Sequence, residues 1–356
     1  MQYNNTNHRV TTPGRCCQHG ISILSRCPQC LEASKDLVPW KIIGRLDTEG
    51  YSNTSIERNG PSYNFTVPES LDKEGRFSGQ VFSINQVQGP SDPRLGEVLN
   101  FLSEQFNENV LNQREDFERK LLGKTRYGTD RPAYRCFYLT NPKNEIIAVR
   151  VAEQIPLLKK GRERKKSSAF YAIYIVLDQS YRGGNNIPVE MYIASLMDAA
   201  ESAYKTGKKV KYLVAECSSA TERLQNKIGL KRVYLKNGER LKELEFFQPP
   251  MEYNPKTGSP ISEESAEHFM LCKTNGSRVT KKNVYTALSS LLNMYRSNHP
   301  REYFISDEAF LAHEKIFEDR LVAIQTQLNE CSEVILLSKD ERTLKVIDFE
   351  AADKVY

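Results

Sequence analysis

Residues 176–203 combine an apolar run, a glycine-containing turn and a helical pattern, an order that suits phosphate binding. The turn consists of Arg182, Gly183, Gly184, Asn185 and Asn186. A strand that enters a helix through a tight turn directs the first helical N–H groups, which lack intrahelical partners, at open space. The glycines permit close backbone approach and the arginine adds positive charge. The sequence therefore predicts a phosphate site, with a ligand-free β-turn-α unit as the alternative.

A second candidate site is a cysteine-rich segment near the start of the chain. Cys16 and His19 form one pair at x-x spacing, and Cys27 and Cys30 form another. Two such pairs give a tetrahedral set of thiolate and imidazole ligands, which favours Zn²⁺. The pattern predicts a structural zinc knuckle, with Cys17 as an alternative to Cys16. Chance clustering or a redox pair is the competing interpretation.

Residues 157–168 form a basic segment between two predicted strands, with six basic residues and one acidic residue. The basic residues are Lys159, Lys160, Arg162, Arg164, Lys165 and Lys166. Such a cluster is either a solvated, flexible hairpin tip or a patch for an acidic partner such as RNA or an acidic peptide. No aromatic residue interrupts it, so it lacks the stacking platform typical of single-strand binding.

The overall composition describes a globular protein. The chain has 356 residues, enough for two or three folding units, with 39% hydrophobic and 27% charged residues. The net charge of +5 is small beside 50 basic and 45 acidic residues and does not by itself indicate nucleic-acid binding. No apolar run is long enough to cross a bilayer, and the first residues contain no secretory-type apolar segment. We therefore expect a cytoplasmic protein without membrane contact.

Hydrophobic periodicity places these candidates on regular elements. Residues 79–275 predict the order β-α-α-β-β-β-α-β-α and a strand-rich tail, a mixed α/β (α+β) layer with one β-α-β crossover. Residues 280–330 predict two amphipathic helices, either a dimer arm or a lid, and residues 333–350 predict a hairpin. The expected organisation is a disordered tail with the zinc segment (1–36), a linker with short strands (37–78), the α/β domain (79–275) and a helical C-terminal extension (276–356).

This order of elements and two sequence blocks resemble the GNAT superfamily of acyl-CoA-dependent N-acyltransferases. The blocks are IVLDQSYRGGNNI, at 175–187, and LVAEC followed by ATERLQNKIGLKRV, at 213–233. The resemblance covers roughly residues 79–275, a little over half of the chain. In that family the turn reads (Arg/Gln)-x-x-Gly-x-(Gly/Ala) and its amides bind the pyrophosphate of coenzyme A. The resemblance therefore implies acyl-CoA as the phosphate-bearing ligand.

Four residues depart from the family pattern. Aligned on Arg182, the small residues of the turn correspond to Asn185, which tolerates left-handed backbone, and to Ile187, whose branched side chain is expected to crowd the approach. The family often carries an Asn early in the later helix and a Tyr that serves as general acid. These positions are Ser218, which would orient the leaving sulfur, and Gln225, which has no titratable proton.

The resemblance implies direct transfer, in which a deprotonated amine attacks the thioester carbonyl. Backbone N–H groups of the central strand, near Val176 and Leu177, would polarise that carbonyl. Glu153 and Glu216, both at predicted strand ends, are the candidate bases, unless they are surface or salt-bridged residues. Tyr174 of the central strand is a candidate acid, unless it is an ordinary core aromatic.

We therefore expect an N-acyltransferase that transfers an acetyl group, or a longer acyl group, from acyl-CoA to an amine. The flanking segments favour a peptide or protein acceptor over a small metabolite. One competing hypothesis is a catalytically degenerate GNAT scaffold that acts as a binding module. Another is an RNA-directed protein that uses the zinc and basic segments, whose affinity would fall steeply with salt.

Overall fold

The computed structural model describes residues 56–59, 62–67, 75–105, 114–124, 134–159, 162–182, 187–206, 208–218, 221–274 and 278–341. The strands are β1 (Ile56–Asn59), β2 (Ser62–Thr66), β3 (Val81–Gln86), β4 (Tyr134–Thr140), β5 (Ile146–Lys159), β6 (Arg162–Leu177), β7 (Lys209–Cys217), β8 (Lys231–Asn237), β9 (Arg240–Glu243), β10 (Phe247–Gln248), β11 (Ser265–Ala266), β12 (His268–Lys273) and β13 (Glu333–Leu337). The helices are α3 (Leu95–Gln105), α4 (Arg114–Leu121), α5 (Ile187–Lys205), α6 (Glu222–Lys227), α7 (Lys281–Ser297) and α8 (Asp307–Glu330), with 3-10 turns η3 (Gln179–Tyr181) and η4 (Arg301–Tyr303).

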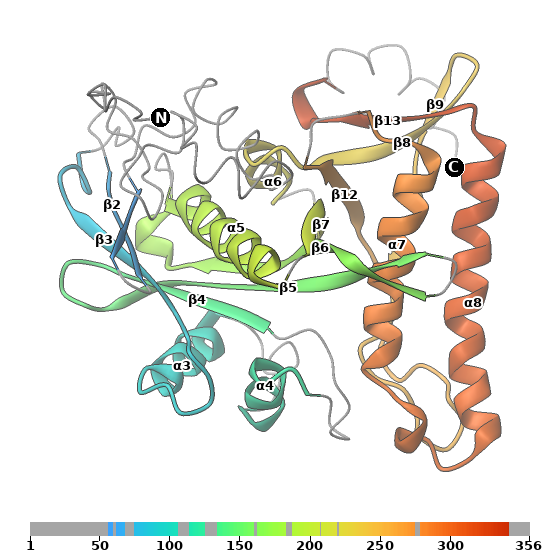
Figure 1. Ribbon diagram of the computed structural model, residues 1–356, viewed down its shortest axis with the longest axis horizontal. Helices are drawn as coiled ribbons and strands as arrows, with labels where there is room; N and C mark the ends of the chain where they lie inside the picture. The colour runs from blue at the N-terminus through green and yellow to red at the C-terminus, as the bar shows by residue number, and fades with distance from the viewer. Residues whose placement is uncertain are drawn as a thin grey trace, which may run out of the picture.

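One mixed sheet of eleven strands runs through the described part of the chain (Figure 1). Its strand order is β1-β2-β3-β4-β5-β6-β7-β12-β8-β13, with β9 paired to β8. Its named strands pair antiparallel except β6 and β7, which are parallel and are joined by the crossover helix α5. This confirms the predicted mixed α/β sheet with one β-α-β crossover, a connection that a parallel pair requires.

Three features of the sheet could not be read from the order of elements. β12 lies between β7 and β8, so the strand-rich tail returns to the interior of the sheet. The basic segment belongs to a long hairpin, because β5 runs to Lys159 and pairs with β6 from Arg162. β13 pairs with β8, and residues 343–350, its predicted hairpin partner, lie outside the described residues.

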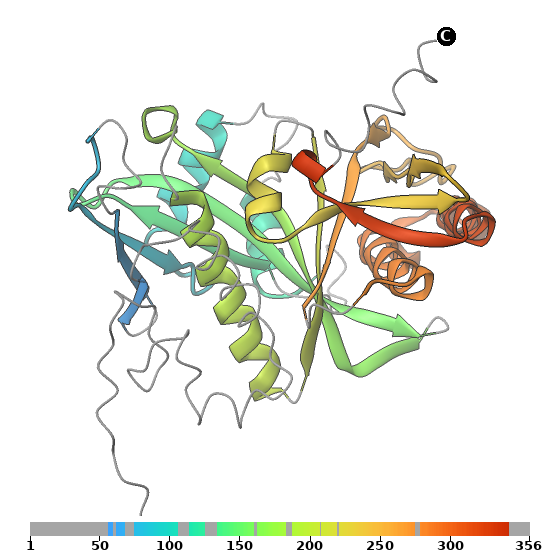
Figure 2. The same cartoon turned by 90° about the horizontal axis from the view of Figure 1, so that it is seen from above.

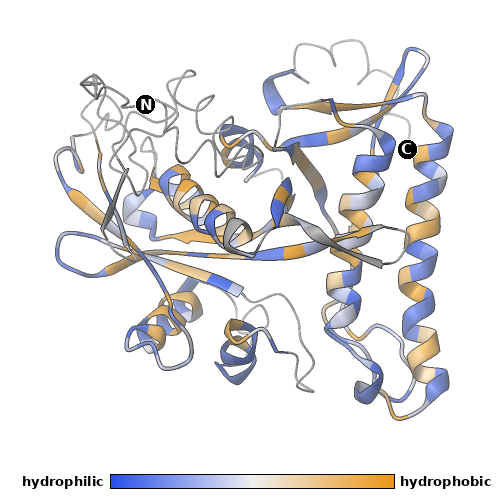
Figure 3. Cartoon of the chain, in the orientation of Figure 1, coloured by the Kyte–Doolittle hydropathy of each residue, from blue (hydrophilic) through white to orange (hydrophobic). Residues whose placement is uncertain are grey.

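Helices cover both faces of the sheet, as Figure 2 shows from above. α5 and α6 pack on the face that carries Leu213 and Ala215 of β7. α7 and α8 pack on the opposite face over Val214, and α3 and α4 cover the neighbouring part around Val149 and Val151. Polar and apolar residues alternate around α7 and α8 in Figure 3, as expected for helices with one buried side. No helix within the described residues is both long and apolar enough to cross a membrane.

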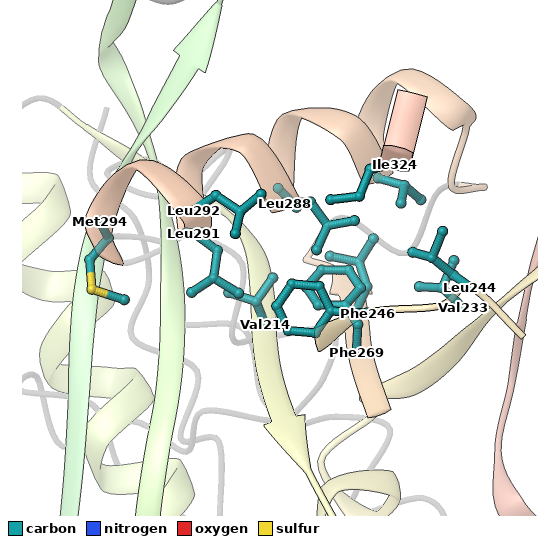
Figure 4. Packing of buried hydrophobic residues seen from close by; sticks show 14 of the residues in the cluster. Val214, Val233, Leu244, Phe246, Phe269, Leu288, Leu291, Leu292, Met294 and Ile324 are labelled. Atoms are coloured by element: carbon teal, nitrogen blue, oxygen red, sulfur yellow. The ribbon is translucent and has the colours of Figure 1, made fainter. Parts of the chain in front are cut away.

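The C-terminal helices share their core with the sheet. Val284, Leu288, Leu291 and Tyr295 of α7 are buried, as expected for the predicted amphipathic helix. Figure 4 shows the leucines of α7 beside residues of the sheet and the segment after β9, including Val214, Phe246 and Phe269. Each fully buried side chain of this size contributes about 1.5–3 kcal/mol. Apolar packing therefore contributes strongly to holding α7 against the sheet.

Two histidines lie in an aromatic cluster where α7 meets α8. His313 of α8 is fully buried, and its ring centroid is 5.7 Å from that of His299, just beyond α7. Tyr253 contacts both rings, at 5.1 Å from His299 and 4.5 Å from His313. Burial lowers the pKa of His313 to about 3 and that of His299 to about 4, and the positive charge of Arg296 adds to the effect on His313. Both rings are therefore neutral at physiological pH.

These histidines predict a loss of stability in acid. An unfolded histidine titrates near 6.5, so below that pH the folded state binds fewer protons than the unfolded state. The free energy of unfolding should therefore fall as the pH drops from about 6.5 toward 4. His313→Phe should remove part of this decrease. Urea midpoints of both proteins near neutral pH and near pH 4.5 measure it, and equal decreases in the two proteins would contradict the assignment.

Candidate functional site

β6 and β7 lie side by side for only part of their length. Within the described strands, their parallel pairing ends at Ala172 and Ala215. β6 continues to Leu177 alongside β5, whereas β7 continues to Cys217 alongside β12. From Ile173 onward, no described strand pairs with the edge of β6 that faced β7.

A β-bulge in β6 marks the same point. Val151 of β5 pairs with Tyr174, but the next residue, Ala152, pairs with Ala172, so Ile173 is an extra residue. Because side chains alternate along a strand, the extra residue brings Ile173 and Tyr174 to the same face. Both pack against the apolar cluster under α3. Bulges of this kind redirect side chains and end strand pairing, and they are frequent beside active sites.

Glu216, the first residue of β7 beyond the paired segment, is the centre of a polar cluster. Its Oε2 accepts hydrogen bonds from the hydroxyl of Tyr171 in β6 and, at 2.5 Å, from that of Tyr295 in α7. The two hydroxyl oxygens are 2.8 Å apart, and Nε2 of Gln248 donates to Tyr295 at 2.9 Å. Among the described residues, Oε1 of Glu216 is buried without a hydrogen-bond partner.

The surroundings of this carboxyl group bring its titration into the neutral range. Burial raises the pKa of Glu216 from its ordinary 4.5 to about 7, the two tyrosine hydrogen bonds lower it, and the charge of Glu267 raises it. Burial and the neighbouring carboxylate raise the pKa of Tyr171 and Tyr295 well above the ordinary value, so both stay protonated. A carboxylate with a pKa near the working pH is suited to act as a general base.

The other two predicted catalytic residues lie close to this point of the sheet. Glu153 is fully buried in β5 and pairs with Tyr171, and directly opposite residues share a face. Tyr174 packs in the apolar cluster with Val149, and burial raises its pKa well above the ordinary value. The tyrosine of the central strand that contacts Glu216 is Tyr171.

Two arginines hold the turn that follows β6. Arg182 is exposed, and its Nε donates to the carbonyl oxygen of Leu177 at 3.0 Å. Arg76, also exposed, donates to the carbonyl oxygens of Ser180 and Arg182 at 3.0 and 3.3 Å. The turn before α5 therefore carries two positive charges at the surface, an arrangement that attracts anions.

Three residues that depart from the family pattern are placed by the structure. Ile187 is fully buried in the core with Phe82, so its side chain contributes to the packing beneath α5. Gln225 is buried in α6, and its Nε2 donates to the hydroxyl of Tyr192 at 2.5 Å. Ser218 directly follows β7 and is exposed.

Some predicted residues lie outside the described part of the chain. These are Gly183, Gly184, Asn185 and Asn186 of the turn, and Cys16, His19, Cys27 and Cys30 of the zinc knuckle. The described residues contain no group of three or more His, Cys, Asp or Glu side chains placed to hold a metal ion. The zinc knuckle stays a prediction from the sequence.

Sequence reasoning missed the roles of Tyr295, Gln248 and Arg76. Tyr295 closes the apolar stripe of α7, where an aromatic residue is indistinguishable from any other core side chain. Its partner Glu216 is 79 positions earlier in the chain, beyond the reach of any helical or strand spacing. Only the docking of α7 on the sheet could reveal the contact.

No protein-family model and no curated protein sequence matches the chain. Among solved structures, the acetyltransferase of the GNAT family from Streptococcus pneumoniae is 15% identical, with a TM-score of 0.31 over 54% of this chain and 99% of that one. The GNAT domain of S. lividans PAT is 9% identical, with a TM-score of 0.32 over 60% and 96%. A GCN5-related glucosamine N-acetyltransferase region in a fungal multi-domain GH3 beta-N-acetylglucosaminidase is 9% identical, with a TM-score of 0.30 over 44% of this chain and only 18% of that one. At these values the similarities assign neither a family nor an activity.

Proposed function

We propose that the protein is an acyl-CoA-dependent N-acyltransferase of the GNAT type, which transfers an acetyl or longer acyl group to an amine of a peptide, protein or other acceptor. The observation that supports this most is the divergence of β6 from β7 at Ala172 and Ala215. It brings a backbone edge with which no described strand pairs, and the carboxylate of Glu216, to the same point of the sheet. An extended ligand binds such an edge through main-chain hydrogen bonds. The resemblance of the following turn to a pyrophosphate-binding loop favours acyl-CoA as that ligand.

The residues where β6 and β7 diverge would each contribute to one part of the acyl transfer. When acyl-CoA is bound, its thioester supplies an activated carbonyl. Backbone N–H groups near Val176 and Leu177 would polarise the carbonyl oxygen. Oε1 of Glu216 would accept the proton of the acceptor amine, with Glu153 as the alternative base. Tyr174, beside the bulge, is our candidate for protonating the leaving thiolate.

Calorimetric titration with acetyl-CoA, and then with a long-chain acyl-CoA, tests the donor. We expect Arg182→Glu to weaken binding by about tenfold or more, since a hydrogen bond to a charged group contributes about 1.5–3 kcal/mol. The loss should shrink at high salt, because exposed charges are screened.

Arg240→Glu is the matched control, because Arg240 is exposed on β9, far from α5 in Figure 1. It makes the same charge change and should leave the dissociation constant within about twofold. If the wild-type protein binds neither acyl-CoA, the proposal fails and a scaffold or binding role takes its place. If both variants weaken binding equally, the turn is not the phosphate site.

A further inference from the structure

Helix α7 contributes a side chain to the cluster around Glu216. We propose that Tyr295 is a positioning residue for Glu216: its hydroxyl, oriented by Gln248, holds Oε2 and leaves Oε1 as the atom that exchanges a proton with the acceptor amine. This inference rests on the proposed function and deepens it, because it makes the C-terminal helices part of the reacting site.

Hydrogen bonds to two strands set the position of α7. Nδ2 of Asn283, in its first turn, donates to the hydroxyl of Tyr212 in β7 at 2.9 Å. Ser290 accepts a hydrogen bond from the backbone N–H of Leu158 in β5, also at 2.9 Å. Polar contacts of this kind fix the rotation and register of a helix that apolar packing alone leaves less specified. Tyr295, little more than one turn beyond Ser290, is thereby held over Glu216.

The distribution of protons explains why Gln248 matters. Each tyrosine hydroxyl has one proton, and Tyr171 and Tyr295 can both stabilise the ionised Glu216 only if both protons are directed at Oε2. The amide of Gln248 donates to the oxygen of Tyr295 and so occupies a lone pair there. With that lone pair occupied, donation from Tyr171 to Tyr295 is disfavoured, so both hydroxyl protons are directed at Oε2 of Glu216.

Few neighbouring groups stabilise the ionised form of the Glu216 carboxylate against the effect of burial. The charged and titratable groups that act on Glu216 are Tyr171 from β6, Tyr295 from α7 and Glu267 ahead of β12, with Glu153 of β5 across from Tyr171. Of the contributions identified in the described part of the chain, only the two hydroxyls favour the charged form. Removing one of them should therefore raise the pKa of Glu216 by about one to two units, since a hydrogen bond to a charged group contributes about 1.5–3 kcal/mol.

The decisive experiment measures that pKa directly. Protein labelled with ¹³C at glutamate carboxyl carbons is titrated by NMR, and Glu216→Gln assigns the signal. We expect the pKa of Glu216 to rise in Tyr295→Phe and to rise less in Gln248→Leu, which keeps both hydroxyls. Tyr285→Phe is the matched control, because Tyr285 lies on the same helix and its hydroxyl makes no hydrogen bond among the described residues. An unchanged pKa in Tyr295→Phe would overturn the inference.

A pH–rate profile separates this inference from the proposed function. In Tyr295→Phe the acid limb of the kcat/KM profile should shift to higher pH, by as much as the pKa of Glu216 rises. In Tyr285→Phe the acid limb should stay at the wild-type pH. If the wild-type protein transfers no acyl group, the proposed function fails and the NMR titration still decides whether Tyr295 positions Glu216. If the NMR pKa moves and the acid limb does not, Tyr295 acts on a carboxylate that is not the base, and its assigned role is overturned.

Discussion

Replacing Glu216 with Gln is expected to lower kcat/KM for acyl transfer by about 10²- to 10⁴-fold, the usual contribution of a general base. Gln keeps the shape of Glu and still accepts hydrogen bonds from Tyr171 and Tyr295, but it cannot take a proton from an amine. Binding of acetyl-CoA should stay within about twofold, since the substitution leaves the turn at Arg182 untouched. Thiol release from acetyl-CoA in the presence of peptide amines measures the rate.

Glu239→Gln is the matched control for this variant, because Glu239 is an exposed carboxylate in the turn between β8 and β9. Its activity should equal that of the wild type. A loss of less than about tenfold in Glu216→Gln would remove Glu216 as the base and leave Glu153 as the remaining candidate. The wild-type rate should also rise as the pH passes about 7, where Glu216 ionises.

The same substitution should stabilise the fold at alkaline pH. Burial raises the pKa of Glu216 from 4.5 to about 7, so between these values the folded state binds more protons than the unfolded state. The contribution of Glu216 to stability therefore falls as the pH rises through this window and stays low above it. Gln carries no charge to bury, so Glu216→Gln should melt at a higher temperature than the wild type near pH 8. Catalytic groups often lower the stability of the folded state in this way.

Replacing Arg232 with Leu is expected to lower the free energy of unfolding by about 3–5 kcal/mol. Arg232 of β8 is almost fully buried, and its two terminal nitrogens contact Glu222 of α6 at 2.6 Å and Glu243 of β9 at 3.2 Å. Glu222 is itself fully buried, so the substitution leaves its charge without the guanidinium that balances it. Urea unfolding monitored by circular dichroism measures the change.

A second variant separates the loss of the ion pair from the loss of packing. Adding Glu222→Gln to Arg232→Leu removes the charge that Arg232 balances in the wild type and should restore a large part of the stability. Arg240→Leu, the same substitution at an exposed position on β9, should change the free energy of unfolding by less than about 0.5 kcal/mol. A loss below about 1 kcal/mol in Arg232→Leu would mean that the buried pair contributes little.

Local patterns in the sequence were enough to predict the central elements of the fold. The apolar run of β6, the helix α5 and the strand β7 followed from hydrophobic periodicity over short windows, and their order implied a parallel crossover. The same reasoning placed Glu216 at a strand end and predicted α7 and α8 as amphipathic helices. These features depend on neighbours within a few residues, which is the range over which periodicity carries information.

The partners of Glu216 depend on contacts that no local pattern contains. Periodicity reports which side of a helix is buried but not which strand that side contacts. From the sequence, Tyr295 is therefore one more core aromatic residue, and only the packing of α7 on the sheet reveals its hydrogen bond to Glu216. The bulge at Ile173 changes the face of Tyr174, and it arises from how β6 pairs with β5. The sequence by itself determined the elements, their order and the candidate carboxylates. Only the tertiary structure decided which side chains meet, because burial, strand register and helix docking are set by residues far apart in the chain.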